Sequence, residues 1–166
     1  MKILFIGFNS SRHYSGGRYH AWLMAQALVK CGHNVDYWTN TTPFFLSDFK
    51  SRKYQDDIGL DLSLDFKIYK KGGYDFVILI PGGDRSLYYK SILSSYVNKS
   101  KLVLLNFESP NWYNDLSPVK KNDNLWSGWN LVAKESVIIL SSCNESTKFA
   151  KKYYVTNDDA QFLTCE

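Results

Sequence analysis

Short apolar runs alternate along this chain with longer amphipathic segments. The apolar runs cover residues 3–6, 35–39, 64–68, 76–80, 102–107 and 137–140. Most of them are continuous, which is typical of parallel strands buried on both faces. The intervening segments predict helices over residues 18–30, 45–54, 85–98, 124–134 and 145–153. Strands that alternate with helices in this way predict an α/β domain with a parallel sheet.

The arrangement expected is one Rossmann-like domain over residues 1–166, a length that fits a single domain. Its doubly wound parallel sheet has six or seven strands in the order 3-2-1-4-5-6, inside three α/β/α layers. In such a sheet, ligands bind beyond the carboxyl ends of the strands, where the strand order reverses. Segments 8–17, 81–84 and 106–113 follow the strands nearest that point and should converge there.

Two local signals mark where helices end and begin. Gly32 follows the first helical pattern and predicts a left-handed stop after it. Ser142 followed by Glu145 predicts a capping box at the start of the last helix.

Composition narrows the class of protein. Hydrophobic residues make up 45% and charged residues 22%, which is too apolar for a disordered chain. The net charge of +4 suits an anionic small ligand or a peripheral contact with a membrane surface, but it is too weak to indicate nucleic acid. The aromatic content of 16% is high, and stacking on sugars or bases is one use for it.

The cysteines and the hydropathy indicate a cytoplasmic protein. Cys31, Cys143 and Cys165 are odd in number, lie far apart and form no CxxC pair, so neither a disulfide framework nor a zinc site is expected. No cluster of His, Cys or Asp has metal-ligand spacing, and no metal or cofactor is expected. No apolar run approaches the roughly 18 residues that a membrane-spanning helix needs.

The glycine loop before the first helix is the first candidate site. Gly16 and Gly17 would expose backbone N–H groups at a helix N-terminus, where a phosphate can dock. Arg18 would pair with that phosphate, and His13 and His20 flank the glycines. The alternatives are a tight turn for the glycines, a solvated arginine, and histidines that pack or face solvent.

Polar residues after the fourth and fifth strands form the second candidate site. Asp84 and Glu108 can act as a general base or accept a hydroxyl, and each can equally cap the next helix. Asn106 and Trp112 lie near Glu108, and a carboxylate, an amide and an aromatic face together suit sugar hydroxyls. The alternative is an ordinary loop with a buried tryptophan. The long polar stretch 108–130, which also holds Trp126 and Trp129, is expected to be functional.

Two common nucleotide-binding motifs are absent. Neither G-x-G-x-x-G nor a Walker pattern occurs. Asp36 lies at a spacing that superficially matches the ribose-binding acid of dinucleotide enzymes, but it falls inside the second strand rather than at its end.

The opening of the chain resembles a known family. The run Ser15-Gly16-Gly17-Arg18-Tyr19-His20, then Met24-Ala25-Gln26-Ala27-Leu28, then Cys31-Gly32-His33-Asn34-Val35, is similar to the start of family-4 glycosyltransferases of the GT-B fold. The resemblance implies two Rossmann-like domains that face a cleft. It also implies a glycine loop that approaches the donor diphosphate and a histidine at the position of His20. Many members carry a histidine after strand 4 or 5, whereas residues 81–84 and 106–108 contain none.

The resemblance implies that the chain is the N-terminal, acceptor-side half of a retaining glycosyltransferase. The donor would be a nucleotide sugar, the acceptor a glycan or a lipid-linked molecule, and a C-terminal donor domain would follow this one. Glu108 and His20 would then be the catalytic candidates, Gly16, Gly17 and Arg18 the donor-phosphate loop, and His13, Asp84, Asn106 and Trp112 the acceptor site. Two alternatives stay open: a stand-alone module that binds a nucleotide or a partner without catalysis, and a dinucleotide oxidoreductase with an atypical loop.

Overall fold

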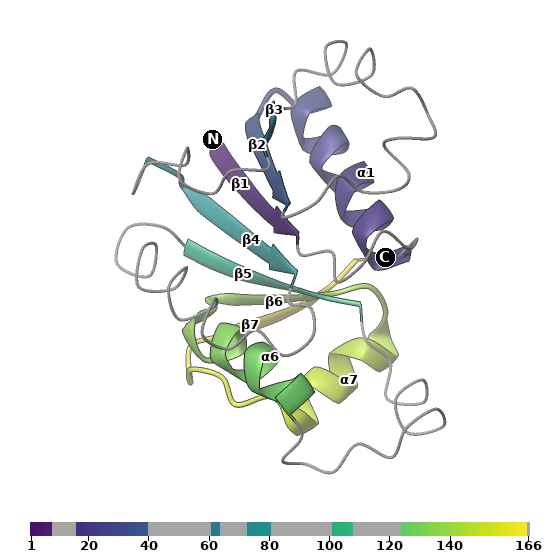
Figure 1. Cartoon of the computed structure of the whole chain (residues 1–166). Helices are drawn as coiled ribbons and strands as arrows, with labels where there is room; N and C mark the ends of the chain where they lie inside the picture. The colour runs from purple at the N-terminus through teal and green to yellow at the C-terminus, as the bar shows by residue number, and fades with distance from the viewer. Residues whose placement is uncertain (8–15, 40–60, 64–72, 81–100, 108–123, 166) are drawn as a thin grey trace.

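The computed structural model describes residues 1–7, 16–39, 61–63, 73–80, 101–107 and 124–165 of the chain (Figure 1). The described strands are β1 (Lys2–Gly7), β2 (Asn34–Thr39), β3 (Asp61–Ser63), β4 (Phe76–Ile80), β5 (Lys101–Asn106), β6 (Ile138–Ser141) and β7 (Gln161–Thr164). The described helices are α1 (Gly16–Lys30), α6 (Asn124–Glu135) and α7 (Asn144–Tyr153).

These strands form one parallel sheet in the order β3-β2-β1-β4-β5-β6-β7. The strand order reverses between β1 and β4, as expected for a doubly wound sheet. The predicted Rossmann-like α/β fold is therefore confirmed, with seven strands.

Helices cover both faces of the sheet, and each face has its own apolar core (Figure 1). On one face, Ala21, Trp22 and Ala25 of α1 pack against β1, β2, β4 and β5. On the other face, α6 and α7 pack against the alternate residues of the same sheet, with Trp129 and Phe149 in the core. Leu4, Phe5 and Leu79 are fully buried, because the central strands are covered on both sides.

The end of α1 forms a complete Schellman motif. Gly32 has a φ of 84°, its N–H donates to the carbonyl of Val29, and the N–H of His33 donates to the carbonyl of Leu28. The predicted left-handed stop at Gly32 is thus confirmed, and it explains why β2 begins two residues later.

Two predicted details differ from the structure, and Trp129 was covered by two predictions. The N-cap of α7 is Cys143, which makes no side-chain capping hydrogen bond, so the capping box predicted at Ser142 is wrong. Gln161–Thr164 forms a strand that its short apolar pattern did not reveal. Trp129 falls both in the stretch 108–130 that was expected to be functional and in the helix predicted over 124–134; the helix is confirmed as α6, and Trp129 is buried in it with its ring stacked on Tyr154, the centroids 6.2 Å apart.

Several predicted elements lie outside the described residues, namely the helices expected over 45–54 and 85–98 and the strand expected over 64–68. None of the helices that the structure describes has the length and hydropathy needed to cross a membrane.

Candidate functional site at the carboxyl edge of the sheet

The carboxyl ends of the described strands meet along one edge of the sheet. Gly7 at the end of β1 is in register with Ile80 at the end of β4, and Asn106 at the end of β5 is in register with Ser141 of β6. Because every strand runs in the same direction, the helices α1 and α7 both begin at this edge (Figure 1). The N-termini of α1 and α7 therefore lie at the edge where doubly wound sheets bind ligands.

Gly17 brings the first turn of α1 against Phe107, the residue that follows β5. A Cβ placed on Gly17 would lie 3.1 Å from Cδ2 of Phe107, closer than carbon atoms normally approach. Of the glycines that the structure describes, Gly32 and Gly73 have positive φ angles and Gly17 does not. The tight-turn alternative therefore does not apply to Gly17, whose missing Cβ lets the first turn of α1 lie close to Phe107.

His20 joins the same contact from the next turn of α1. Its ring centroid lies 5.3 Å from that of Phe107, with the two rings inclined at 47°. The His20 residue is exposed, so one face of its imidazole packs while the rest is accessible from solvent. Gly17, His20 and Phe107 are thus brought together at the carboxyl edge, within segments that the sequence predicts to converge, although it gave Phe107 no role of its own.

Asn106 is turned inward. It has no exposed surface, and its Nδ2 donates to Ser141 Oγ at 3.2 Å and to the Ser146 carbonyl at 3.1 Å. Its Oδ1 accepts from the Tyr154 hydroxyl at 3.0 Å. Direct contact with an acceptor would break these bonds, so the geometry gives Asn106 a structural role, which is to join β5, β6 and α7 beneath the edge.

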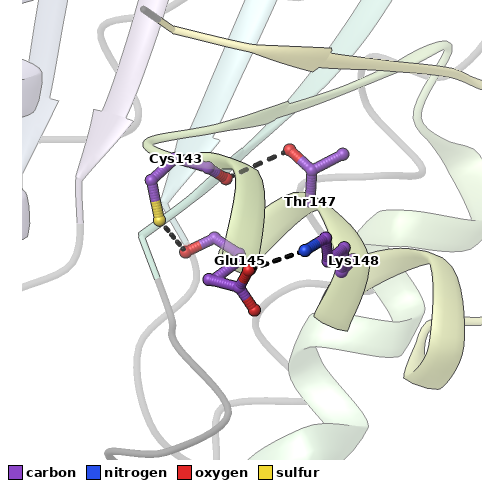
Figure 2. A network of polar contacts seen from close by, with 5 residues as sticks. Cys143, Glu145, Thr147 and Lys148 are labelled. Carbon is purple, nitrogen blue, oxygen red and sulfur yellow. Dashed lines mark hydrogen bonds and ion pairs between the residues drawn. The ribbon is translucent and has the colours of Figure 1, made fainter.

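Cys143 places a thiol at this edge (Figure 2). From the sequence, this cysteine was considered only as evidence for the cellular compartment. Its Sγ lies 3.3 Å from Ser146 Oγ in the first turn of α7. Hydrogen bonding from the Ser146 hydroxyl is the largest cause that lowers the pKa of this exposed thiol. The sequence contained a signal for this site, because Cys143 lies between a predicted strand and the start of a predicted helix.

The rest of this network is structural. The Cys143 carbonyl accepts from the Thr147 N–H and hydroxyl, and Glu145 pairs with Lys148 at 2.8 Å on the exposed surface (Figure 2). Thr147 Oγ1 also meets Thr164 Oγ1 at 2.8 Å, which ties the start of α7 to the end of β7.

Asp36 lies inside β2, as expected from the sequence, and makes an internal contact. The Tyr74 hydroxyl donates to its Oδ2 at 2.6 Å. This position is away from the end of the strand, where the ribose-binding acid of a dinucleotide site would lie.

Several predicted site residues lie outside the described part of the chain: His13, Asp84, Glu108 and Trp112. Gly16 and Arg18 lie in the first turn of α1, but the side chain of Arg18 is not described. The described residues contain no group of three His, Cys, Asp or Glu side chains that could hold a metal ion.

A comparison with protein-family models, with curated proteins and with solved structures finds no match to this chain. A proposal for its function rests on the geometry of the sheet edge and on the resemblance expected from the motifs in residues 15–35.

Proposed function

We propose that this chain is the acceptor-side domain of a retaining glycosyltransferase, which moves a sugar from a nucleotide sugar to a glycan or a lipid-linked acceptor. The supporting observation is the position of the first turn of α1. It lies at the carboxyl edge of a parallel sheet, beside the residue that follows β5, with Gly17 and Phe107 in contact.

The N-terminus of α1 would stabilise the leaving diphosphate. The first N–H groups of a helix have no partner inside the helix, and its dipole favours negative charge at this end. No acidic residue occupies the first turn of α1, so no carboxylate there opposes an incoming phosphate. Arg18 in the same turn would add a positive charge, and stabilisation of charge that develops on the leaving group accelerates bond cleavage.

The remaining roles come from the family resemblance and from the order of residues along the chain. His20 is exposed two positions beyond Arg18 and would contact the transferred sugar. Glu108, the residue after Phe107, would accept a hydrogen bond from the acceptor hydroxyl. In the reaction, the bond from the anomeric carbon to the donor phosphate breaks and a bond to the acceptor oxygen forms. The acceptor proton leaves with the diphosphate, and the anomeric configuration is kept.

Sugar transfer by the complete gene product tests this proposal. The protein is incubated with radiolabelled uridine, guanosine and adenosine diphosphate sugars and with a lipid and glycan extract, and incorporated label is counted. We expect transfer from one donor class. His20→Ala should lower kcat/KM about 100-fold, within the range of effects that follow the loss of one polar group acting in a transition state.

His33→Ala is the matched control, because His33 lies at the opposite end of α1, and it should leave transfer unchanged. Absence of transfer from every donor class would reject the proposal. Equal activity of the His20→Ala and unsubstituted proteins would remove His20 from the site.

A second candidate is a stand-alone nucleotide-binding module. It is favoured by the sheet itself, since seven strands pair within this one chain. This candidate predicts saturable binding of a nucleotide or nucleotide sugar to the 166-residue chain, measured by calorimetry, without turnover. The glycosyltransferase proposal instead predicts that transfer requires a second, donor-binding domain.

A further inference from the structure

We draw no further inference here: the strongest candidate, the exposed Cys143 thiol at the start of α7 on the carboxyl edge of the sheet, is a lone cysteine at a helix N-terminus, and nothing else in the part of the chain that the structure describes points to a ligand there.

Discussion

Cys143 and Cys165 show how position within one fold sets the chemistry of the same side chain. The Cys143 thiol is exposed at the start of α7, where a hydrogen bond from the Ser146 hydroxyl lowers its pKa. Cys165 follows β7, and burial raises the pKa of its thiol. The thiolate is the nucleophilic form, so the two residues should differ in reactivity at neutral pH.

Alkylation is therefore expected to modify Cys143 before Cys165. A time course with iodoacetamide at pH 7.5, followed by peptide mass spectrometry, measures the two rates. As the pH rises, the Cys143 rate should level off at a lower pH than the Cys165 rate. Ser146→Ala removes the largest cause of the lowered pKa and should move the Cys143 profile to higher pH. Earlier modification of Cys165 would contradict the geometry at α7.

Asn106 illustrates what one buried amide contributes. Its side chain donates to Ser141 and to the Ser146 carbonyl and accepts from the Tyr154 hydroxyl, and no part of it is exposed. Replacement by alanine leaves the Tyr154 hydroxyl without this acceptor in a dry environment, which costs about 1–3 kcal/mol for each group left unsatisfied.

Asn106→Ala should accordingly lower the free energy of unfolding by about 2–3 kcal/mol, measured by urea denaturation. Tyr154→Phe on the Asn106→Ala background should cost less than Tyr154→Phe on its own, since the hydroxyl has already lost this partner. Additive effects of the two substitutions would show that the hydrogen bond between them contributes little.

At the scale of elements, the Schellman motif decides where α1 stops. Gly32 adopts a φ of 84°, and a Cβ there would meet no atom within 4 Å. The cost of a larger residue is therefore conformational rather than steric. Gly32→Ala should lower the free energy of unfolding by about 1 kcal/mol, and Gly32→Asn by less, because asparagine tolerates this region. Equal stabilities in urea denaturation would exclude a left-handed residue at this position.

The elements that the sequence predicted are those with strong and long patterns. The strands around Leu4, Leu79 and Leu104 are buried on both faces, so their apolar runs are unmistakable. β7 has only four residues and lies at the end of the strand order, with Gln161 and Leu163 exposed, so nothing in its pattern separates it from a loop. The start of α7 was misplaced by one residue, because Cys143 caps the helix through backbone geometry that residue type does not reveal.

The candidate site was less predictable than the fold. Strand topology placed Gly17 and His20 at the carboxyl edge in advance, because every parallel strand ends there. The same topology predicts that segments 8–17 and 106–113 converge, but it does not reveal that Phe107 is the side chain that contacts Gly17 and His20. Asn106 carries an amide, a group that often binds sugar hydroxyls. Its hydrogen bonds to Ser146 and Tyr154 point the side chain into the protein, and the sequence does not reveal this orientation.

At the scale of the whole molecule, stability should be highest in the centre of the sheet. β1 pairs on both sides and lies between the two apolar cores, whereas β7 pairs with β6 and lies at the end of the strand order. In native-state hydrogen exchange, the amides of Leu4 and Phe5 should exchange at least about 100-fold more slowly than those of Phe162 and Leu163. Similar protection of β1 and β7 would contradict this strand order.

The central place of β1 also matters while the chain is being made. β2 follows it closely and can pair with one of its edges early, but the other edge is completed only by β4, after a long intervening stretch of sequence. Until residue 80 has left the ribosome, the nascent protein carries an apolar strand with an open edge, the kind of surface that chaperones shield. The arrangement that pairs β1 on both sides in the finished molecule leaves one of its edges open during synthesis.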